Sequence, residues 1–198
     1  MLEDGSVYEG TARGDFKETA CEIVFNTSMT GYVEILTDPS YAGQGVVMTY
    51  PMIGNYGISR EDFESERLQP SAFIVHELSS DPSNFRCTDT IENLLKEYNI
   101  PCISGVDTRA VVKKLRESGT MRGVLTSDIG DRERLMDVIK SFRQIDLVGS
   151  VTAKQTKVYG EENTGAEIAL MDFGTKRNII NNLSLIHISE PTRLALIS

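Results

Sequence analysis

The chain is poor in the residues that most often build reactive or cross-linked sites. It contains no tryptophan, two histidines and three cysteines among 198 residues. Cys21, Cys87 and Cys102 are odd in number and irregularly spaced, so the sequence indicates neither a disulfide framework nor a C-x-x-C metal or redox site. This cysteine usage is typical of a reducing compartment, and we predict a cytoplasmic protein.

Long hydrophobic runs and an excess of positive charge are also absent. No apolar run approaches the roughly 20 residues that span a bilayer, and the opening "MLEDGSVYEG" is too acidic for a signal peptide. The net charge of -9 argues against binding to nucleic acid or to an anionic membrane, because such a surface needs a basic patch. With 40% hydrophobic residues, the chain is long enough for one complete domain and a piece of a second.

The texture of the sequence changes along the chain. Up to about residue 75, short β-branched or apolar runs are separated by Gly, Pro, Asn and Asp, which predicts strands and few helices. From about residue 88, capped segments with helical spacing alternate with strand candidates, which predicts an α/β second half. The expected strands are 6–10, 21–25, 45–50, 72–78, 101–106 and 120–126, and the expected helices are 88–99, 107–119 and 131–142.

Beyond residue 150 the chain becomes polar and then apolar again. Residues 151–166 lack apolar periodicity and are predicted to be a linker with at most one strand. Residues 167–183, "EIALMDFGTKRNIINNL", have the pattern of a strand, a glycine turn and a helix, as in the first βα unit of an open parallel sheet. Only residues 184–198 follow, so we expect the second domain to be cut off.

Few residues suggest catalysis. Cys102 and His76 could form a nucleophilic pair, but "IPCISG" has the pattern of a buried strand rather than of a turn that exposes a thiol. His187 lies in the final segment, and the spacing of the two histidines predicts no metal site. The basic pair Lys176 and Arg177 could meet an anion at a helix start, although solvated side chains are the favoured interpretation.

The segment "FNTSMTGYVEILTDPSYAGQ", residues 25–44, is rich in hydroxyl groups and has no Lys, Arg, His or Cys. Hydroxyl and amide side chains beside Gly and Pro most often form turns and caps, and residues 37–40 carry such a turn signal. The alternative is that these groups offer neutral hydrogen bonds to a polar ligand or a partner surface. Spacing alone leaves both interpretations open.

This segment, followed at once by "MTYPMIGNYG", resembles the small subunit of glutamine-hydrolysing carbamoyl-phosphate synthase. The resemblance extends to "LEDGSVYEG" near the start and to "SNFR" at residues 83–86. It continues through "ISGVDTRAVVKKLRESGTMRGVL" at 103–125 and "MDFGTKRNII" at 171–180. Because the separated motifs occur in order over residues 2–183, their combination is more specific than any one of them.

The resemblance implies a fold and a reaction. The fold is a three-layer β/β/α domain of the swivelling type over residues 1–150, joined by the linker 151–166 to a truncated class I glutamine amidotransferase domain at 167–183. The family hydrolyses glutamine and passes ammonia to a large subunit, which makes carbamoyl phosphate from bicarbonate and ATP for arginine and pyrimidine biosynthesis. The expected partner is this large subunit, in a heterodimer or a higher oligomer. ATP and Mg would be used by the large subunit, and no cofactor is expected on this chain.

The resemblance also assigns residues. Ser40 matches the serine that reaches from the first domain to the glutamine bound in the amidotransferase domain. No catalytic residue is expected here, because none of the three cysteines matches the G-x-C-x-G elbow and the family's Cys-His-Glu triad lies further along its chains. The fragment alone is therefore expected to be inactive.

Two features depart from the family's pattern. The segment 184–198, "SLIHISEPTRLALIS", does not resemble the family's continuation and is interpreted as a non-native tail. The start is expected to lack a few strand residues. Two alternatives stay open: a non-catalytic assembly module with the same fold, and an unrelated small hydrolase with its own Ser or Cys nucleophile.

Overall fold

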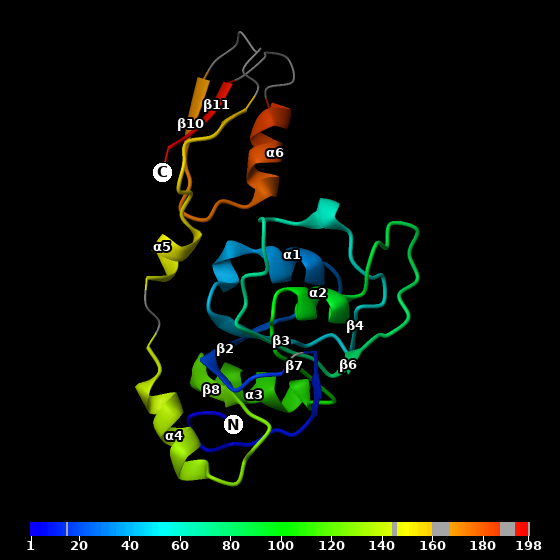
Figure 1. Ribbon diagram of the computed structural model, residues 1–198, viewed down its shortest axis with the longest axis vertical. Helices are drawn as coiled ribbons and strands as arrows, with labels where there is room; N and C mark the ends of the chain where they lie inside the picture. Colours follow the sequence, from blue (N-terminus) through cyan, green and yellow to red (C-terminus); the bar gives the residue numbers. More distant parts are fainter. Residues whose placement is uncertain (15, 144–145, 160–166, 187–192, 198) are drawn as a thin grey trace.

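The computed structural model describes residues 1–14, 16–143, 146–159, 167–186 and 193–197. Its main part is one six-stranded sheet in the order β1-β7-β5-β3-β2-β8 (Figure 1). The four inner strands run parallel, and the two edge strands pair antiparallel to their neighbours. The strands are β1 Thr11–Arg13, β2 Thr19–Asn26, β3 Gln44–Met48, β5 Ala72–Ile74, β7 Cys102–Ser104 and β8 Met121–Leu125.

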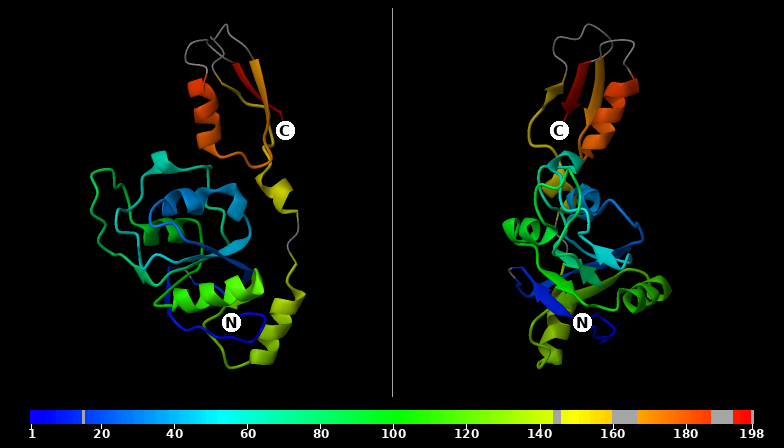
Figure 2. Two further views of the ribbon diagram at one scale, coloured as in Figure 1. Left: turned by 180° about the vertical axis from the view of Figure 1, so that it is seen from behind. Right: turned by 90° about the vertical axis from the view of Figure 1, so that its right-hand side faces the viewer.

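Helices cover both faces of this sheet, so the α/β class predicted from the sequence is confirmed (Figures 1 and 2). On one face lie α1 and α2, together with a two-stranded ribbon of β4 and β6. On the other face lies α3. The helix α4 packs at the β8 edge of the sheet, in a separate cluster with Val124 and Ala20. The bounds are α1 Tyr32–Thr37, α2 Ile91–Glu97, α3 Thr108–Ser118, α4 Arg132–Ser141, β4 Met52–Ile53 and β6 Glu77–Leu78. The swivelling-type β/β/α arrangement of layers stays a prediction.

Alternation along the inner strands builds one core on each face. Val46, Phe73 and Cys102 point to the face of α1 and α2, whereas Val47 and Ile74 point to the face of α3. This is the period-2 pattern expected of strands buried on both sides. The predicted texture is confirmed, since strands dominate up to residue 78 and then alternate with helices.

Two expectations from the sequence are wrong in detail. Residues 6–10 are not a strand; pairing begins at Thr11, which lies opposite Ser104. The helix α1 was not expected, because its sequence "YVEILT" is rich in the β-branched and aromatic residues that favour strands. Burial of Tyr32, Val33 and Leu36 against the sheet overrides this local preference.

A smaller unit follows the main sheet (Figure 1). The short helix α5, Leu147–Val151, lies where the linker was predicted to start, and β9, Val158–Tyr159, is the one strand described within that linker. The strand β10, Glu167–Met171, leads through a glycine turn into α6, Arg177–Ile186. This is the predicted βα unit.

The final segment takes part in the smaller unit. The helix α6 includes residues 184–186, and β11, Arg193–Ile197, pairs parallel with β10. The interpretation of residues 184–198 as a non-native tail stays a prediction. Across the described residues, no helix is both long and apolar enough to cross a membrane.

Candidate functional site

Ser40 lies in a single 3-10 turn, Pro39–Tyr41, that follows α1 directly. The Asp38 carboxylate accepts a hydrogen bond from the Ser40 backbone N–H at 2.9 Å, which closes the turn. The turn predicted at residues 37–40 is therefore confirmed. The Ser40 side chain is exposed, and its hydroxyl makes no hydrogen bond to any residue that the structure describes.

Two tyrosines, Tyr32 and Tyr56, hold the helix α1 that precedes this turn. The Tyr56 hydroxyl accepts hydrogen bonds from the backbone N–H groups of Gly31 (2.7 Å) and Tyr32 (3.1 Å), so it caps the start of α1. In return, the Tyr32 hydroxyl donates to the Gly57 carbonyl at 2.8 Å, and the two rings stack with centroids 4.1 Å apart. Burial raises the pKa of both phenols, so they stay neutral donors and acceptors at physiological pH.

An ion pair joins the Ser40 turn to the smaller unit. Lys176 Nζ lies 2.6 Å from the second oxygen of Asp38, whose side chain is 9% exposed. The hydrogen bond to Asp38 raises the pKa of Lys176. The interpretation of Lys176 as a simply solvated residue is therefore wrong, because its charge is directed at a buried carboxylate.

The loop between β10 and α6 packs against the same turn. Gly174 has φ +103°, and a Cβ built on it would lie 3.1 Å from Pro39 Cβ and 2.7 Å from Val151 Cγ2. Glycine is needed there for its backbone conformation and for this close approach. The Asp172 side chain fixes the loop by accepting from the N–H groups of Gly174 (3.0 Å) and Thr175 (2.7 Å). The exposed Ser40 thus lies where two loops from distant parts of the chain meet.

Cys102 and His76 do not form a nucleophilic pair, as the strand pattern of "IPCISG" indicated. Cys102 is fully buried in the core beneath α2, and burial raises the pKa of its thiol to about 12. Cys21 is equally buried, and its pKa is likewise raised to about 12. His76 is exposed, with Nδ1 3.0 Å from the Val106 carbonyl oxygen. His187 lies outside the described residues.

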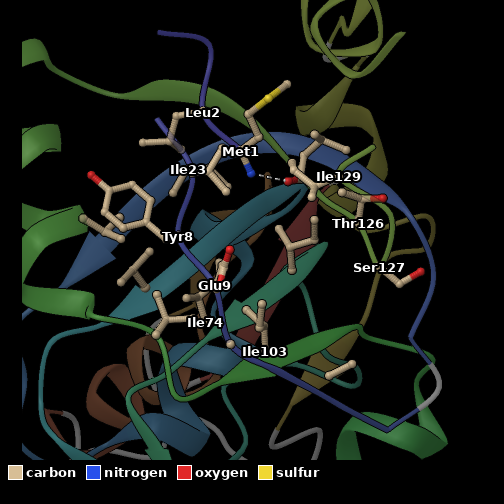
Figure 3. A pocket seen from close by; sticks show the side chains of 18 of the residues that line it. Met1, Leu2, Tyr8, Glu9, Ile23, Ile74, Ile103, Thr126, Ser127 and Ile129 are labelled. Atoms are coloured by element: carbon tan, nitrogen blue, oxygen red, sulfur yellow. Dashed lines mark hydrogen bonds between the residues drawn. The ribbon is translucent and has the colours of Figure 1, made fainter. Parts of the chain in front are cut away.

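A cavity of about 410 Å³ lies on the face of α3, opposite to the face that carries α1 (Figure 3). Aliphatic side chains such as Ile23, Ile74 and Ile103 surround it, and Glu9 and Ser127 are among its few polar groups. It holds no pair of groups suited to acid-base or nucleophilic chemistry. Within the described ranges, no group of three or more His, Cys, Asp or Glu could hold a metal ion.

Sequence reasoning missed an anchored surface loop at residues 83–86. The Arg86 guanidinium binds the carboxylates of Asp62 at 2.6 Å and Glu61 at 3.2 Å. The neighbouring Phe85 is 98% exposed. No local pattern pairs Arg86 with acids more than 20 residues earlier, so the sequence offered no signal for this contact.

Comparison with known proteins agrees with the resemblance. Residues 1–125 match the family model described as carbamoyl-phosphate synthase small chain, CPSase domain. The relatives found include the carbamoyl phosphate synthase small chains of Clostridium perfringens, Caldanaerobacter subterraneus and Archaeoglobus fulgidus. Their identities are 47% over 183 residues, 46% over 185 residues and 47% over 187 residues, respectively.

The matches cover most of this chain but only about half of each relative. These matches include 92%, 93% and 92% of this chain, but only 52%, 49% and 51% of the respective relatives. The chain therefore spans about half the length of the relatives that it matches. The matched domain and the long alignments at this identity show that the chain belongs to the carbamoyl-phosphate synthase small-chain family.

Proposed function

We propose that this chain forms the first domain, and the start of the second, of a small subunit that hydrolyses glutamine for carbamoyl phosphate synthesis. Ammonia released there would pass to a large subunit, which combines it with bicarbonate at the expense of ATP and Mg. The partner would be that large subunit, in a heterodimer or a higher oligomer. The reaction would supply arginine and pyrimidine biosynthesis in the cytoplasm.

The observation that carries the proposal is the position of Ser40. Its exposed hydroxyl sits beside Asp38 and Pro39, which contact the loop between β10 and α6 of the smaller unit. A neutral hydroxyl suits a substrate such as glutamine, whose amino-acid end offers both donors and acceptors. We propose Ser40 as the glutamine contact contributed by the first domain.

The chain alone is proposed to be inactive. Catalysis by a buried thiol would require a thiolate, and burial raises the pKa of Cys21 and of Cys102 well above neutrality. This disfavours the alternative of a separate small hydrolase that uses either of these cysteines. A non-catalytic assembly module with the same fold stays the second candidate, because it needs no nucleophile.

The test uses a complete small subunit, made by joining residues 1–183 to the remaining half of the Clostridium perfringens small chain. In this protein we expect Ser40→Ala to raise the glutamine KM about 3- to 10-fold with little change in kcat, since one hydrogen bond to the substrate is lost. Ser28→Ala, which removes an exposed hydroxyl of the same segment, is the matched control. An unchanged KM in Ser40→Ala would refute the assignment, and a glutaminase-inactive fusion that still binds a large subunit would favour the assembly module.

A further inference from the structure

Glu64 connects the first domain to the start of α6. Its backbone carbonyl accepts a hydrogen bond from the Arg177 N–H at 2.8 Å. Its side-chain oxygen Oε2 accepts from the Asn178 N–H at 2.9 Å, although the two residues lie 114 positions apart. The first N–H groups of a helix have no partner within the helix, and a carboxylate there is also favoured by the helix dipole. Glu64 supplies both the hydrogen-bond acceptors for these N–H groups and the negative charge at the helix start.

A local cap is not possible at this helix. The residue before α6 is Lys176. Its ammonium group can only donate hydrogen bonds, so it cannot accept from the helix N–H groups, and it is directed at Asp38. Ordinarily a Ser, Thr, Asp or Asn at this position would accept from the second or third N–H of the helix. The carboxylate of Glu64, from the other domain, takes that role.

Glu64 is itself fixed to the helix that precedes Ser40. The Glu64 N–H donates to the Thr37 hydroxyl at 2.9 Å, and that hydroxyl in turn donates to the Val33 carbonyl at 2.9 Å. Thr37 is fully buried, and its own carbonyl accepts from the Ser65 hydroxyl at 2.5 Å. The position of Glu64 is thus tied to the last residue of α1, three residues before Ser40.

Two attachments therefore run side by side between the domains. Asp38 holds Lys176, and Glu64, bonded to Thr37, holds the first turn of α6. We refer to Thr37, Asp38, Glu64, Lys176 and Asn178 as the junction clamp. Because neighbouring residues of one domain hold neighbouring residues of the other, the clamp restricts rotation as well as separation of the two units.

We propose that Glu64 is a positioning residue that sets α6 and the preceding loop relative to Ser40. The inference rests on the proposed function, because the site that it aligns is the glutamine site at the meeting of the two domains. Small displacements of a binding group weaken its hydrogen bonds steeply, so loosening the clamp raises KM without removing any group that touches substrate.

The capping contact is tested first, in the 198-residue chain and without any assay of activity. We expect Glu64→Ala to increase amide hydrogen exchange about 5- to 10-fold at Asn178, because this N–H group loses its side-chain acceptor. The Arg177 N–H keeps the backbone carbonyl of residue 64 as its acceptor and should change less. Glu64→Gln keeps a side-chain oxygen acceptor and should exchange within about twofold of the unchanged chain. Glu61→Ala is the matched control, because Glu61 binds Arg86 within the first domain.

The positioning role is tested in the complete small subunit described above. We expect Glu64→Ala to raise the glutamine KM about 3- to 10-fold with kcat within about twofold, and Glu64→Gln to restore most of the loss. Glu61→Ala should leave both constants unchanged. Thermal midpoints separate positioning from a loss of stability. If Glu64→Ala raised KM by destabilising the whole fold, its thermal midpoint would lie below that of Glu64→Gln.

The outcomes separate this inference from the proposed function. Unchanged exchange at Asn178 in a folded Glu64→Ala chain would overturn the capping contact. Faster exchange with an unchanged KM would overturn the positioning role. A fusion in which Ser40→Ala also fails to alter KM would count against the proposed function, whereas an effect of Ser40→Ala without one of Glu64→Ala would count against the inference alone.

Discussion

The carboxylate of Glu18 links three elements of the first domain. Its two oxygens lie 2.7 and 2.9 Å from the two terminal nitrogens of Arg134 on α4, and the Thr126 hydroxyl donates to it at 2.8 Å. The hydrogen bond from Arg134, and then that from Thr126, lowers the pKa of Glu18 from an ordinary 4.5 to about 2. A bidentate pair of this kind is stronger than most surface ion pairs, although partial exposure weakens it.

This shift predicts a pH dependence. Because the folded pKa lies below the unfolded one, the stabilisation is complete above about pH 4.5 and is lost as the pH falls toward 2. We expect Glu18→Gln to lower the thermal midpoint by about 2–4 °C at pH 7. The difference from the unchanged chain should shrink between pH 4.5 and pH 2.5 in melts followed by circular dichroism. A difference that stayed constant over this range would show that Glu18 acts by packing alone.

At the same scale, the sequence could locate Ser40 but not its surroundings. The turn at residues 37–40 is local, since Asp38 bonds a backbone group two residues away, and such turns follow from residue type. Glu64, which binds Thr37, and Lys176, which binds Asp38, reach the turn from distant parts of the chain. No spacing rule connects them, so the junction clamp needed a structure.

The helices show why some elements could be predicted and one could not. Thr90, Asp107 and Asp131 each cap their own helix by accepting a backbone hydrogen bond from three residues later, a signal that the sequence carries openly. The helix α1 has Gly31 at its cap and no local acceptor. Its cap is the Tyr56 hydroxyl, supplied by folding, so the sequence alone favours turns and caps in this segment and predicts no helix.

The edge strand β1 depends on one glycine. A Cβ on Gly10 would overlap the Ser104 carbonyl oxygen and lie 2.9 Å from Ile103 Cγ1, at the strand with which β1 pairs. We expect Gly10→Ala to cost about 1–3 kcal/mol, because backbone atoms must move to admit the methyl group. The measurement is the urea midpoint of unfolding.

Gly130→Ala is the control for this variant. There the added Cβ would meet only a side-chain oxygen of Asp128, at 3.0 Å, which accepts from the Gly130 N–H and needs to shift by only a few tenths of an ångström. We expect it to change the urea midpoint little. Equal midpoints for the two variants would mean that β1 shifts freely and contributes little to the fold.

At the scale of the whole molecule, the two units are held by different forces. The three clusters of buried hydrophobic residues found in the described part of the chain include no residue beyond Phe142. Apart from the packing of Gly174 on Pro39, the contacts described across the junction are polar, such as Lys157 with Glu66 and Lys176 with Asp38. The sequence anticipated this division, because hydrophobic periodicity stops before residue 151 and resumes only in the βα unit.

This division predicts that residues 1–143 fold without the rest. Removing the second unit takes away polar contacts and the packing of Gly174 on Pro39, but no member of the three buried clusters. We expect a single cooperative melt with a midpoint within about 10 °C of the 198-residue chain, since a few polar contacts contribute only a few kcal/mol. Side chains such as Met171 (61% exposed) and Phe173 (55% exposed) leave the second unit with little core, so residues 144–198 alone should show no cooperative transition. A broad melt of residues 1–143 would mean instead that the junction clamp is part of the folding unit, and that Ser40 is ordered only when both domains are present.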